Sequence, residues 1–326
     1  MEYVRLGRSG LEVSQIVMGC MGFGEPGRGN HAWTVGPEEG RKLVATALEL
    51  GVNVFDTANV YADGTNEELL GRILRELGAV REEIVIATKV YGRVAPGPNR
   101  EGLSRKAIVQ EVDNSLRRLG VDYIDLLQIH RFDKVTPLDE TLIALDSLVQ
   151  AGKVLYLGAS SMDAWRFVVA RERQRELGLA PFISMQNQYS LIAREDEREL
   201  LPYCAHAGVG VIPWSPLGRG KLARPWGEST KRAELDEIAK HNYQQAVDSD
   251  RAVVNAVEEV ARERGRPMSH VAIAWLRRNP ALTAPIIGVT AEQHLRDAVA
   301  ALDLVLTDEE AARLEAPYVP RLPELY

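Results

Sequence analysis

Apolar and polar positions follow two alternating patterns along this chain. Stretches with apolar residues at i, i+3 and i+4 are each followed by a short run rich in β-branched residues. These runs are continuously apolar, which is typical of strands buried on both faces of a parallel sheet. We predict strands near 15–19, 52–55, 84–88, 123–129, 154–158, 182–185, 209–212 and 284–287.

Helices are predicted between these strands. Several begin at residues that favour helix N-termini, among them Pro37, Ser104 and Pro137. The predicted helices lie near 37–50, 66–78, 104–119, 137–151, 163–177, 194–207, 251–265 and 291–302, with an additional one near 269–278. Eight strand–helix units in succession predict an α/β fold of the closed (β/α)8 TIM-barrel type.

Three segments interrupt the repeating pattern. Residues 1–14 contain two short extended pieces around Ser9-Gly10, which predict a β-hairpin ahead of the first strand. Residues 20–36 form a Gly-rich loop, and residues 213–250 form a long loop after the seventh strand. A loop of that length indicates a function or some structure of its own. Because no linker, low-complexity tract or repeat is visible, residues 1–326 are predicted to form a single barrel domain.

One glycine motif has the spacing of a dinucleotide-binding fingerprint but lacks the necessary context. Gly22, Gly24 and Gly27 fit G-x-G-x-x-G directly after the first predicted strand. In a Rossmann fold the third glycine lies in a helix whose N-terminus faces the pyrophosphate. Helical spacing begins here only near Pro37, so we interpret this segment as a loop.

Composition narrows the classes of function. The formal net charge of −7 gives no general attraction to nucleic acid or anionic lipid. No apolar run reaches the roughly 18–20 residues that cross a bilayer. With Cys20 and Cys204 as its two cysteines and no secretory signal pattern, the chain is expected to be cytoplasmic and without a disulfide framework. The sequence leaves the oligomeric state open.

Polar side chains follow the ends of three consecutive predicted strands. Asp56 ends the second strand, Lys89 the third and His130 the fourth. Tyr61 stands shortly after Asp56. Because the carboxyl ends of barrel strands meet at one mouth, we expect these four catalytic candidates to converge. A lysine ammonium lowers the pKa of a neighbouring tyrosine, so Tyr61 is predicted to protonate a carbonyl oxygen that His130 orients.

Each of these residues also has a purely structural interpretation. Asp56 fits a loop residue, Lys89 a surface lysine and His130 a buried histidine with satisfied hydrogen bonds. Metal binding is not supported, since the six histidines show no HxxxH or Cys/His ligand spacing. Ser160 and Ser161 do not lie in a G-x-S-x-G elbow, which argues against a serine triad.

At these residues the sequence resembles the aldo-keto reductase family. The stretch from Gly51 to Tyr61 (GVNVFDTANVY), followed by EELLG at 67–71, resembles the first family signature. The stretch from Leu116 to Leu126 (LRRLGVDYIDL), leading into His130, resembles the second. IATK at 86–89 matches the region of the lysine, and PIIG at 285–288 matches the third region. The resemblance extends in order from about residue 3 to 318.

A finer resemblance is to the bacterial aryl-alcohol dehydrogenase-like branch. Four stretches carry it: GRGNHAW at 27–33, QIHR at 128–131, GASSM at 158–162 and WSPLGRG at 214–220. The resemblance implies NADPH, or its oxidised form NADP⁺, bound in an extended form across the barrel mouth without a Rossmann fold. It also implies residues that line the substrate pocket, namely Trp33, Tyr91 and Arg131.

The same resemblance implies residues for each part of the cofactor. Ser160, Ser161 and Gln186 would hold the nicotinamide carboxamide, and Trp214 would stack on the ring. The pyrophosphate and the adenosine end would be held by two further groups of residues. The residues for the pyrophosphate are Ser215, Leu217, Gly218, Gly220 and Lys221. Those for the adenosine end are Gly288, Thr290, Gln293 and Asp297.

The chain departs from the family pattern at Ala291. Relatives often carry a lysine or arginine there, which would pair with the 2′-phosphate of NADPH. Arg296 is not an obvious geometric substitute, so use of NADH stays open beside the expected NADPH.

Three functions are therefore compared. The first is an NAD(P)H-dependent oxidoreductase acting on a small carbonyl substrate, such as an aromatic or aliphatic aldehyde. The second is a regulatory or binding protein of the same fold that keeps the cofactor but turns over weakly. The third is an isomerase or aldolase in which Lys89 forms a Schiff base; it leaves Tyr61 and His130 without a clear role.

Overall fold

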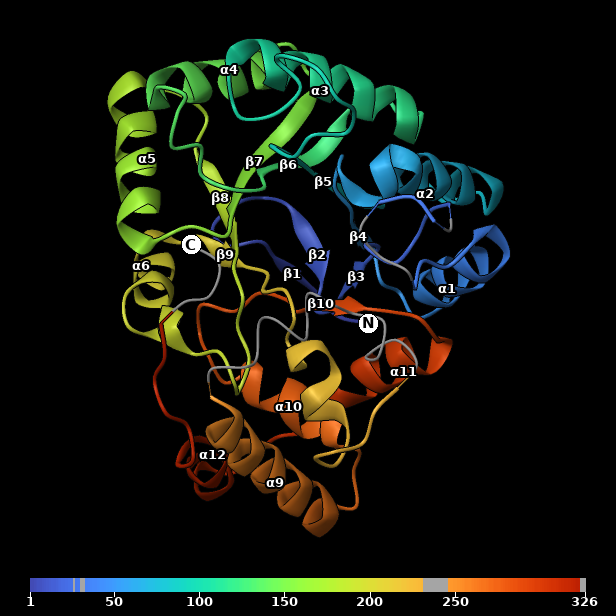
Figure 1. Cartoon of the computed structure of the whole chain (residues 1–326), viewed down its shortest axis with the longest axis vertical. Helices are drawn as coiled ribbons and strands as arrows, with labels where there is room; N and C mark the ends of the chain where they lie inside the picture. Colours follow the sequence, from blue (N-terminus) through green and yellow to red (C-terminus); the bar gives the residue numbers. More distant parts are fainter. Residues whose placement is uncertain (26, 30–32, 231–245, 323–326) are drawn as a thin grey trace.

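Eight parallel strands form the centre of the molecule, as the computed structural model shows (Figure 1). The structure describes residues 1–25, 27–29, 33–230 and 246–322. Neighbouring strands pair in sequence order from β3 to β9, and β10 pairs with β3 on its other side. The strands are β3 (Val17–Gly19), β4 (Val54–Asp56), β5 (Val85–Val90), β6 (Ile124–Ile129), β7 (Val154–Ser160), β8 (Phe182–Gln186), β9 (Gly210–Val211) and β10 (Ile286–Gly288).

The sheet closes between β9 and the segment that leads into β10. The Val211 amide donates to the Ala281 carbonyl at 3.2 Å, and the Thr283 amide donates to the Val211 carbonyl at 2.8 Å. Two residues beyond Val211, the Pro213 carbonyl accepts a hydrogen bond from the Ile286 amide at 3.0 Å. These bonds complete the ring, and the predicted (β/α)8 barrel is confirmed.

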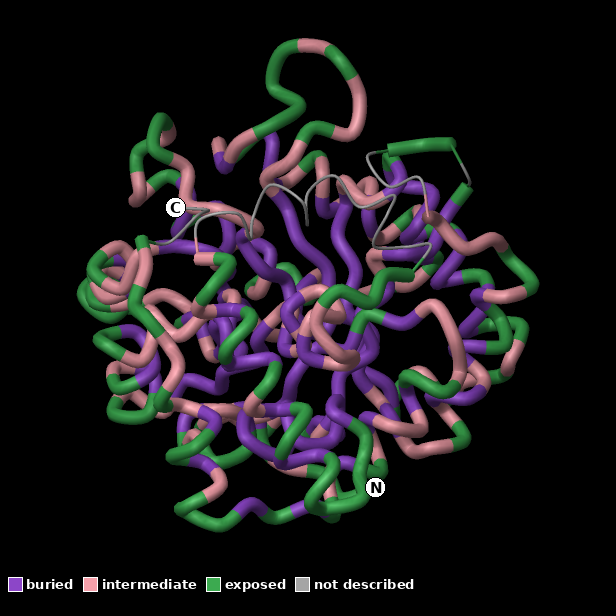
Figure 2. Tube along the Cα trace, turned by 60° about the horizontal axis from the view of Figure 1, so that its bottom comes forward, coloured by how far each residue is buried: buried purple, intermediate pink, exposed green. Residues whose placement is uncertain are grey.

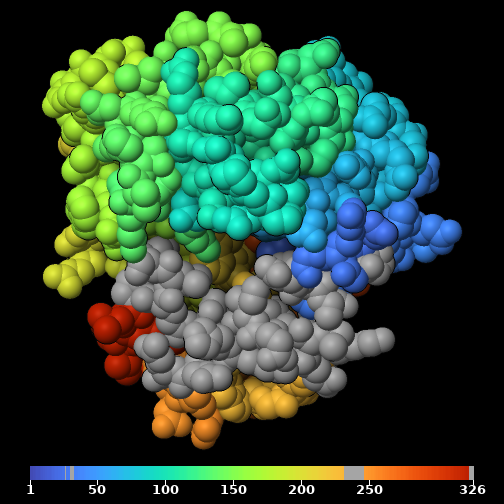
Figure 3. Space-filling model, turned by 45° about the horizontal axis from the view of Figure 1, so that its top comes forward, coloured from blue at the N-terminus to red at the C-terminus, as the bar shows by residue number. Residues whose placement is uncertain are grey.

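Helices cover the outside of the barrel, and burial concentrates in the strands and the inward faces of the helices (Figure 2). Residues from the first half of the chain, blue to green in Figure 3, form one continuous side of the surface. The helices are α1 (Pro37–Glu49), α2 (Thr65–Glu76), α3 (Arg105–Leu119), α4 (Leu138–Gln150), α5 (Ala164–Leu177), α6 (Leu200–Ala207), α9 (Val247–Arg264), α10 (Met268–Leu276), α11 (Glu292–Ala300) and α12 (Asp308–Glu315).

Two helical segments differ from the sequence prediction. The helix predicted over 194–207 divides into a short 3-10 helix, η2 (Glu195–Glu197), and α6. Pro202 explains the division, because proline is tolerated in the first turn of α6 but would break a helix that began at 194. Helix α12 was not predicted, although its N-terminus carries a capping box formed by Thr307 and Glu310.

The predicted N-terminal hairpin is present and covers the amino-terminal end of the barrel. Strands β1 (Tyr3–Arg5) and β2 (Glu12–Ser14) pair in antiparallel fashion. Leu6 and Val13 are buried in one apolar cluster with residues of the barrel strands, including Val85. The hairpin therefore fills the closed end of the barrel, and the opposite end remains for a site.

The two predicted loops are described in part. The first described helix after Gly22 and Gly24 is α1, which agrees with the interpretation of the glycine motif as a loop. The loop after β9 begins with a 3-10 helix, η3 (Gly218–Ala223). Residues 26 and 30–32 of the Gly-rich loop, 231–245 of the long loop and 323–326 of the tail lie outside the described residues. In the described part of the chain, every helix is too short or too polar to cross a membrane.

Candidate active site

The four catalytic candidates come together at the carboxyl end of the barrel. Asp56 is the last residue of β4, Lys89 lies near the end of β5, and His130 follows β6 directly. Tyr61 begins a short 3-10 helix, η1 (Tyr61–Gly64), after β4. Its ring centroid lies 5.8 Å from that of His130 in an edge-to-face arrangement and 5.2 Å from Lys89 Nζ.

Lys89 and Asp56 form an ion pair that is closed to solvent. The ammonium Nζ donates to the two Asp56 carboxylate oxygens at 2.8 and 2.5 Å and to the Thr57 carbonyl at 2.8 Å. Burial alone would lower the pKa of Lys89, but Asp56 and Tyr61 together outweigh it, and the pKa is raised above 10.5. Lys89 is therefore a cation. A Schiff base requires the neutral amine, so this geometry argues against the aldolase interpretation.

The pKa of Tyr61 differs from the sequence expectation. Burial of the phenol raises its pKa above the ordinary value of 10.0, and the charge of Lys89 lowers it by less. Lys89 thus acts in the predicted direction, but desolvation of the phenolate is the larger effect and the net shift is upward. Tyr61 is a neutral phenol with a proton to donate.

His130 is held as a neutral imidazole. Burial lowers its pKa well below 6.5, and the positive charges of Lys89 and Arg131 lower it further. A neutral imidazole carries one N–H donor and one acceptor nitrogen. His130 can therefore donate a hydrogen bond to a carbonyl oxygen without bringing a third charge to the site.

Two buried glutamines hold the Asp56 carboxylate from the other side. Gln186 Nε2 donates to Asp56 Oδ1 at 2.9 Å and to Gln128 Oε1 at 2.9 Å, while Gln128 Nε2 lies 3.3 Å from the same carboxylate oxygen. Sequence reasoning did not select Gln128. The available signal was a polar residue, near the end of the strand, inside the otherwise apolar run of β6.

The residues predicted for the nicotinamide end are linked to one another. Ser160 Oγ donates to the Gln186 carbonyl at 2.8 Å, and Trp214 Nε1 donates to Ser161 Oγ at 3.1 Å. The Ser161 amide donates to Asn187 Oδ1 at 2.8 Å. Asn187 is a further residue that the sequence analysis left out of the site, although it follows the end of β8. Together these residues form a buried hydroxyl and amide surface at the barrel mouth.

The predicted pyrophosphate loop folds into a compact turn. Ser215, Gly218 and Gly220 have positive φ values of 52°, 54° and 94°, and the Gly220 amide donates to the Leu217 carbonyl at 2.8 Å. Glycine adopts this backbone conformation at no steric cost, and its missing side chain permits close approach of a ligand. Lys221, whose pKa is lowered by burial, lies with Nζ 4.8 Å from the Trp226 ring.

The residues predicted for the adenosine end lie around β10 and α11. Gly288 ends β10, and Thr290 follows in the turn before the helix. On α11, Gln293 Nε2 donates to Asp297 Oδ1 at 2.8 Å. The four residues are thus neighbours on one segment of the chain.

Ala291 and Arg296 both belong to the segment of α11. Ala291 occupies the N-cap position of α11. Arg296 pairs with Glu49 at 3.2 Å and with Glu292 at 3.9 Å. The charge of Arg296 is thus directed to two carboxylates on the outer surface.

The predicted pocket residues follow strands β3, β5 and β6. Tyr91 follows β5, and Arg131 follows β6 with Nη1 donating to the His130 carbonyl at 3.0 Å. Trp33 lies in the loop after β3 and packs so closely on Gly22 that a β-carbon there would be 2.8 Å from the indole. Trp33 is therefore part of the packing of its own loop.

A buried carboxylate extends this network behind the site. Asn187 Nδ2 donates to Asp196 Oδ2 at 2.9 Å, so Asp196 helps to orient the amide that receives the Ser161 N–H. Burial raises the pKa of Asp196 from 3.8 to about 7, and the charges of Glu195 and Asp163 add to this rise. The hydrogen bond from Asn187 opposes it in part.

We predict that Asp196→Asn changes stability in a pH-dependent way. A carboxyl group whose pKa is raised on folding penalises the folded state increasingly as pH rises from about 4 to about 7. Asparagine removes this penalty, so the gain in Tm over the wild type should be larger at about pH 8 than at about pH 5. Thermal denaturation at both pH values tests this, and an equal difference at the two would contradict it.

A buried ion pair between lysine and aspartate, a protonated tyrosine and a neutral histidine at the mouth of a (β/α)8 barrel define an enzyme with an acid–base site. The chain belongs to the aldo/keto reductase family, whose model matches residues 15–318. It is an NAD(P)H-dependent oxidoreductase, and the predicted membership is confirmed.

Relatives match almost the whole chain. A versiconal hemiacetal acetate reductase of Aspergillus parasiticus is 44% identical, with 98% of each chain covered. An aldo-keto reductase of Alternaria alternata is 40% identical, covering 99% of this chain and 93% of its own. A Saccharomyces cerevisiae protein that carries the name of an aryl-alcohol dehydrogenase is 38% identical, with 98% and 97% covered. The resemblance to that branch is confirmed, although these relatives are fungal and the sequence analysis expected bacterial ones.

Proposed function

We propose that this protein reduces a small aldehyde or ketone to the alcohol with NADPH, and that Tyr61 is the general acid. The observation that supports this most directly is the placement of a protonated phenol between the Lys89 ammonium and the His130 imidazole. A general acid must hold its proton before the reaction and release it to the developing alkoxide. Lys89 favours the phenolate that remains, since a nearby cation stabilises an anion.

The donor set at the mouth fits a nicotinamide cofactor. Ser160 and Ser161 place their hydroxyl groups 3.0 Å apart, and Ser160 donates to the backbone carbonyl of Gln186; hydroxyl groups can both donate to and accept from a carboxamide. Trp214 is fixed through its indole N–H to Ser161, which favours a ring-stacking position. When bound, the reduced cofactor supplies the hydride.

In this proposal the protein moves the proton and orients the substrate. His130 donates a hydrogen bond to the carbonyl oxygen and thereby aims it toward the Tyr61 hydroxyl. The phenol then transfers its proton to that oxygen. Asp56 keeps Lys89 charged throughout, and the two buried glutamines keep Asp56 in place. We further propose a cytoplasmic location, with which the two free, buried cysteines agree.

A cofactor comparison tests the function and the departure at Ala291 together. We expect oxidation of NADPH in the presence of aromatic or aliphatic aldehydes, with NADH as a weaker alternative. Ala291→Arg should lower the KM for NADPH by about tenfold, the effect of one charge-assisted hydrogen bond, and leave the KM for NADH nearly unchanged. Ala291→Gln is the matched control, because it adds length without charge.

Two results would overturn these statements. Absence of turnover with both cofactors over a panel of aldehydes and ketones would remove the proposed function. An equal change of both KM values in Ala291→Arg would show that residue 291 does not face the 2′-phosphate.

A further inference from the structure

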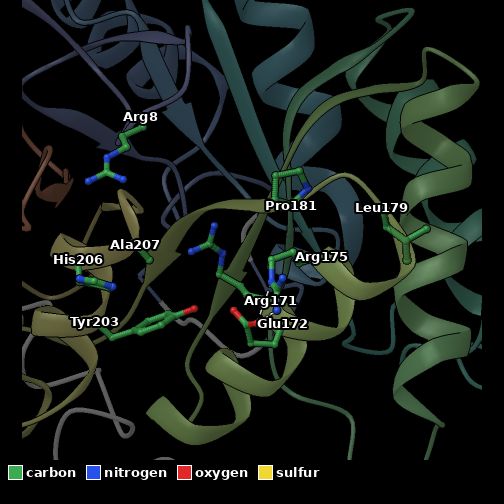
Figure 4. Close-up of a pocket in the computed structure, with 10 residues that line it drawn as sticks. Arg8, Arg171, Glu172, Arg175, Leu179, Pro181, Tyr203, His206 and Ala207 are labelled. Carbon is green, nitrogen blue, oxygen red and sulfur yellow. Dashed lines mark hydrogen bonds and ion pairs between the residues drawn. The ribbon is translucent and has the colours of Figure 1, made fainter.

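A cavity of about 690 Å³ lies at the amino-terminal end of the barrel, opposite the candidate active site (Figure 4). Leu179 and Pro181, in the segment that enters β8, line it, whereas Gln186 at the active site ends the same strand. Arg8 comes from the turn of the N-terminal hairpin, where its amide donates to the Gly208 carbonyl at 2.8 Å. The cavity is therefore formed where the hairpin meets the ends of α5 and α6.

Arginine side chains from two of these segments surround the cavity. Arg8 approaches from the hairpin, while Arg171 and Arg175 come from α5; in Figure 4 the Arg171 guanidinium lies between the other two. Glu172 is the acidic residue of the lining, and it is bound to Arg175 at 2.7 Å. Further N–H and O–H donors come from His206 and Tyr203 of α6.

The positive charge of the three arginines exceeds the negative charge that Glu172 and the two helix C-termini bring to the cavity. Helices α5 and α6 both end at this cavity, before Gly178 and Gly208. A helix C-terminus carries about half a negative charge, so the two together contribute roughly one. With Glu172 counted as well, the three arginines leave an excess of about one positive charge, in a chain whose net charge is −7.

Among the described residues neither Arg8 nor Arg171 is paired with a carboxylate, and Arg171 also has a buried nitrogen, Nε, without a hydrogen-bond partner. Arg81 and Arg321 also have a buried, unbonded Nε, but both are paired with a carboxylate through another nitrogen. The neighbouring Cys204 thiol does not serve, since burial raises its pKa to about 12 and it stays neutral.

We propose that this cavity binds a small molecule that carries a phosphate group. An unpaired and partly buried guanidinium is unfavourable until an anion supplies the missing hydrogen bonds. Arginine binds phosphate oxygens through two parallel N–H donors, and Arg8 and Arg171 line the same cavity from two different segments of the chain. Leu179, Pro181 and Ala207 offer an apolar wall for the rest of the molecule.

Calorimetric titration with pyrophosphate at constant ionic strength tests the proposal. Wild type should bind it, and Arg171→Gln should weaken binding by about tenfold or more, as expected for loss of a charge-assisted contact. The matched control is Arg173→Gln, since Arg173 lies on the same helix but pairs with Asp139 at 2.7 Å. The Kd of Arg173→Gln for pyrophosphate should stay within about twofold of the wild-type value. Arg173 does not line the cavity, and its effect on a distant ligand is screened by salt.

Each alternative outcome overturns the inference. Absence of pyrophosphate binding to the wild type would show that the cavity has no affinity for phosphate. An equal loss of affinity in Arg171→Gln and Arg173→Gln would show that only the net charge of the protein matters. Binding that persists in Arg171→Gln would place pyrophosphate elsewhere, for example at Lys221. Because the charge removed in Arg171→Gln is unpaired, this variant should keep the wild-type Tm in the absence of ligand. Arg8→Gln, on an independent segment, is a second variant that should also weaken pyrophosphate binding. Reductase turnover should be the same in all three variants.

Discussion

Tyr61→Phe should lower kcat for carbonyl reduction by about 10²- to 10⁴-fold, the usual contribution of a positioned general acid. The change removes one oxygen atom and leaves a ring that can still pack against His130. The proton for the developing alkoxide must then come from water, which lacks the position that the protein gives to the phenol. The Kd for NADPH, measured by quenching of tryptophan fluorescence, should stay within about twofold, because the phenol takes no part in binding the cofactor.

The matched control is Tyr156→Phe. Tyr156 lies in the first half of β7, away from the barrel mouth, and its phenol is not part of the network around Asp56. This variant should retain the wild-type kcat. Full turnover in Tyr61→Phe, or an equal loss in both variants, would remove Tyr61 from its proposed role.

Lys89→Met should destabilise the folded protein by about 3–5 kcal/mol, the usual effect of removing one partner of a buried ion pair. The Asp56 carboxylate then stays buried with two glutamine donors but without a counter-charge. Asp56→Asn should have a similar effect, because the buried ammonium keeps neutral acceptors such as the Thr57 carbonyl but loses its counter-charge. Both variants should also lose most of their turnover.

Urea denaturation of the single and double variants separates pairing from packing. Asp56→Asn with Lys89→Met should cost less than the sum of the single changes, since no charge is left unpaired. The exposed pair of Arg313 and Glu263 gives the control: Arg313→Gln should change stability far less than either buried change, because exposed ion pairs contribute little. Additive effects of the buried changes, or losses no larger than the control, would show that the pair does not act as a unit.

The pH dependence of this pair follows from the raised pKa of Lys89. A basic group with a higher pKa in the folded than in the unfolded state stabilises the fold below the unfolded value of 10.5. That stabilisation is lost as pH rises through the folded value. The wild type should therefore lose stability above about pH 10.5 more steeply than Lys89→Met, in which this group is absent.

Much of the fold follows from local pattern. The strands begin or end within a few residues of their predicted positions because each is a continuously apolar run with polar residues at its ends. Predictions failed where local signals conflicted or were weak. The predicted helix over 194–207 is divided at its start because Pro202 must lie in the first turn of α6. The short helix α12 was not predicted, although its capping residues Thr307 and Glu310 could be identified from the sequence.

Part of the candidate site could also be predicted from local sequence pattern. Asp56, Lys89 and His130 stand at the ends of consecutive strands, and barrel geometry alone requires those ends to converge. Gln128 and Asn187 were not selected, because a lone amide at a strand end does not reveal its partner. The Gln186 amide meets the Asp56 carboxylate across 130 residues of sequence, a contact that no local pattern encodes.

The sequence by itself determined the eightfold order of strands and helices, the family, and the identity of the four polar residues at the barrel mouth. These depend on residue type and spacing, which are local properties of the chain. Only the tertiary structure decided the protonation of Tyr61, because the desolvation that outweighs Lys89 comes from the surrounding barrel. It also brought Arg8 and Arg171 to one cavity, since charges far apart in sequence acquire a common environment only when the hairpin packs beneath α5 and α6.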